Sequence, residues 1–405
     1  MTAPTLEADP DCARPAGSTT LGPERRLRAE LRPFAAIPPE TWDRLAGLNP
    51  WATPFSAWAF HRAWWDAYGD NAHEETMVVV DAGAEPGSID AEPIAIVPLM
   101  HRHVVEASDA TTHTAIRHGT GPELTPVSPT AKAVYFGASY HADYATILGD
   151  PGEFPAVADA LVDTFGDDSL PNIGHPAPWD AIDLRRLRTG DPAALALAAA
   201  FGRREITEGW TLNVEREEVC PVATIPADAD MDGFLGTLGK KERHEIRRKV
   251  HRAEAAGEVE LVVSKDSPAD LEAFIDLHEA RWGEEGLFPD TAGGAQSRVM
   301  FRRLFELFGS DGPLRLCFLT VGGRRIGAAV YFETADSLLY YNAGVDPAAR
   351  ALSPGVLIVE QLFRHAIHAG KRRVDFLRGD EPYKYEWGAV DEPIQRLLVR
   401  RTGIA

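Results

Sequence analysis

Residues 340–370 read YYNAGVDPAARALSPGVLIVEQLFRHAIHAG, and this stretch decides the fold. The apolar pattern predicts a strand over Ser337 to Asn342, which ends in the first residues of this stretch. It also predicts a helix over Pro354 to Ala369, in the last part of the stretch. A strand that passes through a short loop into a helix is the building unit of an α/β sheet. The loop from Arg350 to Gly355 between them is the first candidate binding segment.

The residues of that loop suit a phosphate. The first turn of a helix has backbone N–H groups without partners and the positive end of the helix dipole. Gly355 lets a ligand approach the backbone, Pro354 needs no N–H partner in the first turn, and Arg350 adds a guanidinium fork. The alternative is an ordinary turn in which Ser353 caps the helix.

The elements around this loop predict a mixed sheet flanked by helices. After a helix over Lys240 to Ala256, the order is strand, two helices, three strands, the helix after the loop, another strand, and a last strand near Gln395 to Arg400. The first half has a similar series, with strands expected at Met77 to Val80, Ile94 to Leu99 and His141 to Leu148.

The length of 405 residues is more than one core usually holds, and a Pro/Asp/Gly-rich stretch at 226–239 separates the two series. We therefore expect a disordered tail over 1–28, an N-terminal domain over 29–225 and a C-terminal domain over 226–405. The repeated order predicts two similar halves that pack side by side with separate sheets.

Composition narrows the class of protein. The first twenty residues have no apolar core of a signal peptide, and no run is long enough for a membrane helix. The three cysteines fit neither a disulfide framework nor a zinc site, so we expect a cytoplasmic protein that holds no metal. The net charge of −20 argues against general nucleic-acid binding, although a local basic site remains compatible with it.

A second candidate site follows the strand predicted over Arg372 to Leu377. Asp375, Arg378, Asp380, Tyr383 and Lys384 lie here within ten residues. Ligand-binding groups gather at strand ends of α/β sheets, whereas the alternative is a solvated turn with ordinary ion pairs.

A third candidate site is the basic helix Lys240 to Arg252. It has seven Lys/Arg against two Glu, with Arg243 and Arg247 on one face. We expect it to face the cleft between the halves and bind an anionic part of a substrate; the alternative is an exposed helix paired with acidic neighbours. In the first half, Asp143 and Tyr144 in His141-Ala-Asp143-Tyr144 are weaker substrate-binding candidates, the alternative being a polar strand end.

The order of these motifs resembles the CelD/BcsL acetyltransferase family, also called BioF-like, within the GNAT superfamily. RHEIRRKVHR, LHEARW, LRLCFLTVGGRRIGAAVYF, the stretch at 340–370 and VDFLRGDEPYKYEWG carry the resemblance from Arg243 to Lys384. PFSAWAFHRAWWDAYG, IAIVPLM and HADYATIL extend it, so that it covers about residues 40–390. This family is similar to the Fem-type peptidyltransferases, which have two GNAT-like halves, and the resemblance thus implies a tandem GNAT-like fold.

The resemblance also implies an activity and its residues. Arg350, Ser353 and Gly355 match the loop that holds the pyrophosphate of acyl-CoA in GNAT enzymes, except that Ser353 stands where Gly is usual. Tyr383-Lys384 looks like the aromatic-Lys pair at the reaction centre of the Fem-type enzymes. The expected enzyme is an N-acyltransferase that uses acetyl-CoA or another acyl-CoA as co-substrate and has no permanently bound cofactor.

The expected reaction is attack by an amine on the thioester. Lys384, or backbone N–H groups near Asn342 to Gly344, would stabilise the oxyanion. We assign the remaining roles by residue type. Asp375, Asp380 or Glu381 would accept the proton of the amine, Tyr341 or Tyr383 would protonate the thiolate, and Arg378 would bind the substrate. The expected acceptor is a small-molecule amine or a cell-envelope or polysaccharide precursor. Two alternatives stay open: an aminoacyl-tRNA donor, favoured by the basic helix, and a non-catalytic binding module.

Overall fold

A computed structural model describes residues 26–102, 124–128, 131–166 and 179–401. Its strands form a four-stranded sheet in the order β1-β3-β4-β7 and an eleven-stranded sheet in the order β10-β11-β12-β13-β14-β9-β15-β8-β6-β5-β2. The expected disordered tail lies outside the described residues up to residue 25. Its last residues are ordered, because β1 begins at Leu27 and pairs with β3.

The N-terminal half alternates short strands with four main helices. Its strands are β1 (Leu27–Leu31), β2 (Ala72–Glu74), β3 (Met77–Asp81), β4 (Ala95–Val97), β5 (Leu99–Arg102), β6 (Ala133–Phe136), β7 (Leu148–Gly149), β8 (Ala181–Arg188) and β9 (Thr211–Thr224). Its helices are α1 (Pro39–Leu48), α2 (Trp58–Tyr68), α5 (Phe154–Gly166) and α6 (Pro192–Glu208).

The C-terminal half follows the predicted order. Its strands are β10 (Val259–Val263), β11 (Leu314–Val321), β12 (Arg324–Glu333), β13 (Ser337–Val345), β14 (Arg373–Asp375) and β15 (Val390–Arg400). Its helices are α7 (Met231–Thr237), α8 (Lys240–Glu254), α9 (Ser267–Trp282), α10 (Ala292–Phe308), α11 (Pro354–His368) and α12 (Pro382–Glu386). A short 3₁₀ segment, η6 (Pro347–Leu352), joins β13 to α11.

The two halves have the same strand-helix-strand unit. In each half two parallel strands are joined through a helix, β13 to β14 through α11 and β6 to β8 through α5. Every other described strand pair is antiparallel. Parallel neighbours require such a crossover, so the repeated unit accounts for the tandem mixed α/β fold.

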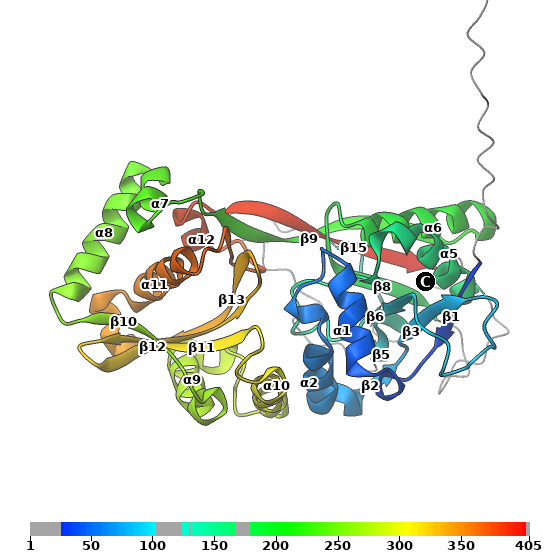
Figure 1. Ribbon diagram of the computed structural model, residues 1–405, viewed down its shortest axis with the longest axis horizontal. Coiled ribbons are helices and arrows are strands. Elements are labelled where there is room, and N and C mark those ends of the chain that lie inside the picture. Colours follow the sequence, from blue (N-terminus) through cyan, green and yellow to red (C-terminus); the bar gives the residue numbers. More distant parts are fainter. Residues whose placement is uncertain (1–25, 103–123, 129–130, 167–178, 402–405) are drawn as a thin grey trace, which may run out of the picture.

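We expected a separate sheet in each half. Instead, the two halves share one continuous sheet. β14 pairs with β9, β9 pairs with β15 along eleven residues, and β15 pairs with β8. The last strand of the chain therefore returns to the first half, and Figure 1 shows β9 and β15 as the long ribbons that connect the two parts. The sheet is continuous because β9 has a strand partner from the C-terminal segment on each side.

Helices cover both faces of the sheet in the C-terminal half. In Figure 1, α7, α8, α11 and α12 lie on one face, and α9 and α10 lie on the other. Two cores result: one on the α11 face includes Tyr340, Phe363 and Phe376, and the other includes Phe301 and Phe332 with Tyr341 packed on it. Tyr340 and Tyr341 thus belong to opposite faces, and α10 also packs against α2 of the first half.

Two predicted strands of the first half were wrong. Pro98, which has no N–H for a ladder, separates β4 from β5, and these two strands enter different sheets. The segment from His141 to Ile147 is a loop and only its end at Leu148 is strand. Side-chain bonds hold it instead, since Tyr144 reaches Asp375 and Asp143 reaches Arg378.

Candidate active site

Strand β13 separates from β14 near the middle of the molecule. The parallel pairing joins Ser337, Leu338 and Leu339 to Arg373, Val374 and Asp375 and then ends. Beyond it, β13 continues to Val345 with β12 alone, and a register shift in that ladder leaves Tyr341 as an extra, bulged residue. This stretch of β13 therefore has an open edge on the side where β14 ends.

The direction of the backbone groups along the open edge follows from two hydrogen bonds. Asp346 donates its N–H to the carbonyl of Ile326 on β12 at 3.0 Å, and the Trp282 indole donates to the carbonyl of Ala343 at 3.2 Å. Successive residues of a strand point to alternate edges. The N–H groups of Asn342 and Gly344 thus point to β12, whereas that of Ala343 points to the open edge.

This alternation corrects part of the expected cofactor site. Asn342 and Gly344 were expected to offer backbone donors, but β12 uses theirs. Gly344 lacks a side chain for another reason, because a Cβ there would lie 2.3 Å from the backbone nitrogen of His278 on α9. The Asn342 side chain bonds the His278 ring, and burial is the main cause that lowers the pKa of that ring to about 4.

A cavity of about 270 Å³ lies between the halves, beside the bulge. It is lined by Tyr140, His141, Asp143, Glu218, Leu287, Tyr341, Asn342, Arg378, Gly379 and Glu381. The lining comes from the loop after β6, strand β9, strand β13 and the loop before α12, so residues far apart in the sequence meet there. Of the residues predicted from sequence, the structure brings Asp143, Tyr341, Asn342, Arg378 and Glu381 to this one wall.

A partly buried ion cluster forms one side of the cavity. The Arg378 guanidinium pairs closely with Asp143 and lies 3.5 Å from Glu218 Oε2. Burial alone would lower the pKa of Arg378, but the two carboxylates outweigh it and raise that pKa. The wall has three carboxylates, and they face the Arg378 guanidinium and the Lys384 ammonium, which lies 2.9 Å from Glu381. The remaining negative charge makes the cavity a favourable place for a cationic amine.

The ammonium group of Lys384 is bonded to its own loop and does not point to the cavity where an oxyanion was expected. Its Nζ donates to the carbonyls of Leu377, Arg378 and Gly379 at 3.1, 2.6 and 2.9 Å, and Glu381 Oε2 lies 2.9 Å away. An ammonium has three N–H bonds, so the loop uses all of them. The residue is 2% exposed. The structure makes Lys384 a positioning residue that holds the loop carrying Arg378.

The two candidate acids differ in their hydrogen bonds. Tyr341 donates its hydroxyl to the carbonyl of His141 at 3.0 Å and lines the cavity. Tyr383 packs on Phe376 on the opposite face of the sheet, and its hydroxyl has no hydrogen-bond partner among the described residues. Burial is the main cause that raises the pKa of both phenols. Only Tyr383 therefore retains a proton that is not already donated.

Asp375 lies behind the cavity wall. Its carboxylate accepts from the Tyr144 hydroxyl at 2.8 Å and from the Leu377 N–H at 2.8 Å. Burial is the main cause that raises the pKa of Asp375 to about 6. Neither Asp375, Tyr144 nor Asp380, which is fully buried, lines the cavity. Their contacts correct the predicted base and substrate roles: Asp375 and Tyr144 tie together the two loops that shape the site.

The expected phosphate loop lies at the end of β13. Ser353 has a left-handed backbone, with φ of 57°, and does not cap α11 with its side chain. Its hydroxyl instead accepts from Arg252 of α8 at 2.7 Å. Arg350 is exposed, and a Cβ on Gly355 would meet no atom within 4 Å. The three residues thus line an open surface at the start of α11.

The basic helix α8 does not face the cavity, contrary to expectation. It lies at the outer end of the C-terminal half in Figure 1. Arg243 donates to the Gly236 carbonyl at 3.3 Å and Arg247 pairs with Asp232 at 2.8 Å, both on α7. These contacts correct the cleft-binding role. Arg252 instead connects α8 to the phosphate loop.

Four residues of the cavity wall were missed by sequence reasoning: Tyr140, His141, Glu218 and Leu287. A signal did exist for Glu218. It follows Glu217 inside a buried strand, where successive side chains point to opposite faces of the sheet. Each of the two buried carboxylates therefore requires a cationic or hydrogen-bonding partner on its own face. Glu217 pairs with Arg186 on one face and Glu218 approaches Arg378 on the other.

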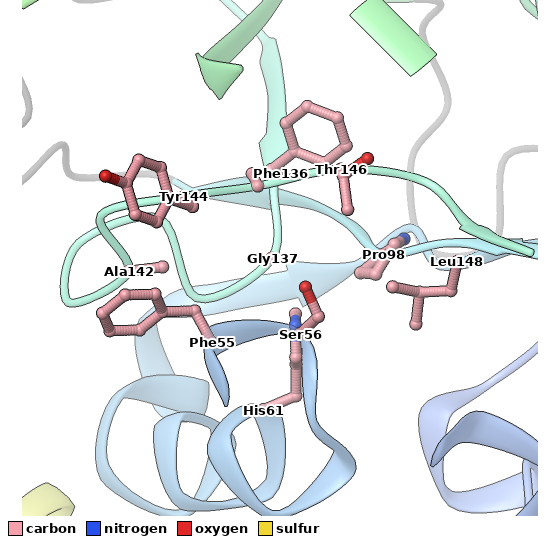
Figure 2. A pocket seen from close by; sticks show the side chains of 11 residues that line it. Phe55, Ser56, His61, Pro98, Phe136, Gly137, Ala142, Tyr144, Thr146 and Leu148 are labelled. Atoms are coloured by element: carbon pink, nitrogen blue, oxygen red, sulfur yellow. The ribbon is translucent and has the colours of Figure 1, made fainter. Parts of the chain in front are cut away.

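A smaller cavity of about 10 Å³ lies within the first half. Figure 2 shows His61 and Ser56 on one side of it and Phe136, Tyr144 and Thr146 on the other. That volume holds about one water molecule. Burial lowers the pKa of His61 to about 3, which keeps its ring neutral. The smaller cavity is thus a packing feature, and the larger one is the candidate site.

Comparisons with known proteins agree with this fold. Residues 240–385 match the family model described as an acetyltransferase (GNAT) domain. The crystal structure of FemX is similar to this chain with a TM-score of 0.54 and 10% identity, over 91% of this chain and 96% of that one. A conserved protein of unknown function from Bacteroides thetaiotaomicron VPI-5482 has a TM-score of 0.52 and 11% identity, over 92% and 99%. At such identities the likeness shows the fold alone. No curated protein matches the sequence.

Proposed function

We propose that this chain, which has a GNAT-type acyltransferase fold, is an N-acyltransferase that moves an acyl group from a phosphopantetheine thioester to an amine. One observation carries the proposal: the open edge of β13 lies beside a cavity with three carboxylates. An acyl carbonyl at that edge would lie between a backbone donor and a bound amine. Acyl-CoA is the simplest such donor.

The proposed step conserves atoms and charge. The bound ammonium first loses one proton to solvent. The neutral amine nitrogen then attacks the thioester carbon, the C–S bond breaks, and the nitrogen loses a second proton while the leaving thiolate gains one. The products are an amide and a thiol, with the carbonyl oxygen carrying negative charge in between. An enzyme accelerates such a step by stabilising that oxyanion, by accepting the amine proton and by protonating the thiolate.

We assign these three tasks to residues of the site. The Ala343 N–H is the oxyanion donor, since it points to the open edge. Glu381 is the base, because it lines the cavity and its side chain is 41% exposed, which lets the proton leave to solvent. Tyr383 is the acid, since its hydroxyl is not donated to another described residue.

The binding roles follow the two faces of the sheet. Arg350, Ser353 and Gly355 hold the donor phosphate on the α11 side, and the wall with Asp143, Glu218 and Arg378 holds the acceptor on the other. The acceptor is a small-molecule amine or a cell-envelope or polysaccharide precursor, in keeping with the narrower resemblance to the CelD/BcsL family. The likeness to FemX leaves aminoacyl-tRNA as the second donor to test.

The direct experiment is native mass spectrometry of the purified protein, followed by incubation with acetyl-CoA and a panel of amines. We expect a bound species with the mass of CoA or an acyl-CoA, and release of free thiol that depends on an amine. Transfer only from aminoacyl-tRNA would assign the second donor. No transfer from either donor, with ligands still bound, would make the chain a binding module.

Glu381→Gln tests the assignment of the base. The amide keeps the size of the side chain, but it cannot take a proton. We expect kcat to fall roughly a hundredfold, as is typical for loss of a general base. Glu386→Gln, at the exposed last residue of α12, should keep kcat. Equal activity of the two variants would contradict the assignment.

A further inference from the structure

The exposed face of α8 is a positive patch on a strongly acidic chain. Between Lys240 and Glu254 the helix has seven Lys/Arg and three Glu, a net charge of +4, whereas the whole chain has −20. Two of the seven basic residues pair with acids, Arg247 with Asp232 and Arg248 with Glu245. The structure describes no acidic partner for the others, which are Lys240, Lys241, Arg243, Lys249 and Arg252.

The patch is continuous with the proposed donor site. Arg252, in the last turn of α8, donates to Ser353 at the start of α11, and α8 packs against both η6 and α11. The exposed Arg350 lies on η6, so basic side chains extend from Lys240 to the phosphate loop. Ala343 lies about 7 Å along the strand from Val345, where β13 ends, and η6 joins that end to the loop.

Resting on the proposed function, we propose that α8 docks an acidic acyl-carrier protein, whose phosphopantetheine arm enters past Ser353 and delivers the thioester to β13. The arm's phosphate is common to CoA and to a carrier protein, so the phosphate loop serves either. The surface beyond the loop differs between the two donors. One nucleotide can contact two or three basic side chains, whereas the basic side chains of α8 are spread over a helix about 22 Å long.

That length and its surroundings favour an acidic protein over RNA. RNA binding needs basic residues along an extended phosphate backbone, and the strongly acidic chain around this one helix would repel a long polyanion. A small acidic domain that meets a single helix face requires only a local patch. The transfer step is unchanged, since the carrier arm leaves as a thiol and the acyl group becomes an amide.

The experiment compares two donors in the full-length protein. The variant is Lys240→Glu/Lys241→Glu/Lys249→Glu, three residues without ion-pair partners among the described side chains. The matched control is Arg26→Glu/Lys265→Glu/Arg372→Glu, which makes the same charge change at exposed sites outside α8. The donors are acetyl-CoA and an acyl carrier protein of fatty-acid synthesis with an acetylated arm.

We expect the α8 variant to raise the KM for the acetylated carrier protein at least tenfold relative to the KM for acetyl-CoA, and the control to leave that ratio unchanged. An equal rise for both donors would mean that α8 contacts the CoA nucleotide and would overturn the proposal. So would an unchanged ratio, or preferential loss of tRNA binding.

A binding measurement separates this inference from the proposed function. Fluorescence anisotropy of labelled carrier protein should show salt-dependent binding that the α8 variant weakens at least tenfold. Binding without transfer from either donor would retain the docking surface and reject the acyltransferase. Transfer from acetyl-CoA without carrier binding would retain the acyltransferase and reject the docking surface.

Discussion

Single residues show where sequence reasoning about the site succeeded and where it failed. The segment from Asp375 to Lys384 was identified as a functional site, and its Arg378, Gly379 and Glu381 do line the cavity. The role of each side chain depends on which way it points. Lys384, whose type and position suggest an oxyanion donor, points inward to three carbonyls of its own loop. No sequence pattern distinguishes these two orientations.

Lys384→Met provides the test at this scale. The change leaves three carbonyl groups without their donor, and a buried polar group without a partner costs about 1–3 kcal/mol. We expect a loss of about 3 kcal/mol in the free energy of unfolding, measured by denaturant titration, because the loop can recover some bonds to water. Turnover should fall as well, since Arg378 and Gly379 move with the loop.

The control for that variant is Lys265→Met, at an exposed position with no ion pair among the described residues. It should leave the free energy of unfolding within about 0.5 kcal/mol of the unchanged protein. A Lys384→Met protein with unchanged stability and a hundredfold lower kcat would restore the oxyanion role to the lysine.

Elements of secondary structure were predicted best where packing follows the local pattern. β3 ends one residue after the predicted strand over Met77 to Val80, and α11 ends one residue before the predicted helix over Pro354 to Ala369. The segment from His141 to Ile147 alternates as a strand does, yet it is a loop. Its polar groups bond distant partners, Asp143 to Arg378 and Tyr144 to Asp375. Contacts with residues more than 200 positions away decide its conformation, and a local pattern cannot contain them.

The packing of β13 against α9 gives a prediction at the scale of elements. A Cβ at Gly344 would lie 2.3 Å from the His278 nitrogen and 2.4 Å from the Leu277 carbonyl carbon, both backbone atoms of α9. Helix and strand would have to separate, and overpacking of this kind costs about 1–3 kcal/mol. We expect Gly344→Ala to lower the melting temperature and to reduce turnover, since the open edge of β13 would move.

Gly355→Ala is the matched control, because a Cβ there meets nothing within 4 Å. It should keep or slightly raise the melting temperature, since Ala is a better helix former than Gly. If Gly344→Ala melts as the unchanged protein does, then α9 and β13 yield easily and their close approach does not set the site.

At the scale of the whole molecule, the shared sheet was the feature that the sequence did not predict. A Pro/Asp/Gly-rich stretch marks a break along the chain, but β15 pairs with residues that lie 168 to 219 positions earlier. The division into 29–225 and 226–405 therefore remains a prediction that the two parts fold as separate units. A variant that weakens the pairing of β15 tests it. In the fold, the C-terminal strand is an integral part of the N-terminal half.

Buried Arg396 holds that strand in place. The side chain is 1% exposed, and it donates to both oxygens of Asp183 on β8 at 2.6 and 2.8 Å and to Glu215 on β9 at 3.0 Å. Burial by itself would raise the pKa of Asp183, but the hydrogen bonds and charges of Arg396 and Arg185 outweigh it and lower that pKa. The group is thus charged in the folded protein and needs its cation.

Arg396→Met tests whether the two halves unfold as one unit. Removing one partner of a buried ion pair costs about 3–5 kcal/mol. We expect the lower end of that range, because Arg185 still pairs with Asp183 at 3.1 Å. Because the sheet is continuous from β8 through β15 and β9 to β14, we expect this loss to destabilise both halves. Calorimetry should show one transition at a lower temperature, and hydrogen exchange should accelerate equally in β8 and in β11.

The control is Arg302→Met, which removes an exposed ion pair with Glu272. It should change the free energy of unfolding by less than about 1 kcal/mol. Two separate transitions, with faster exchange in β8 and unchanged exchange in β11, would contradict this prediction. The halves would then unfold as independent domains although their strands pair in one sheet.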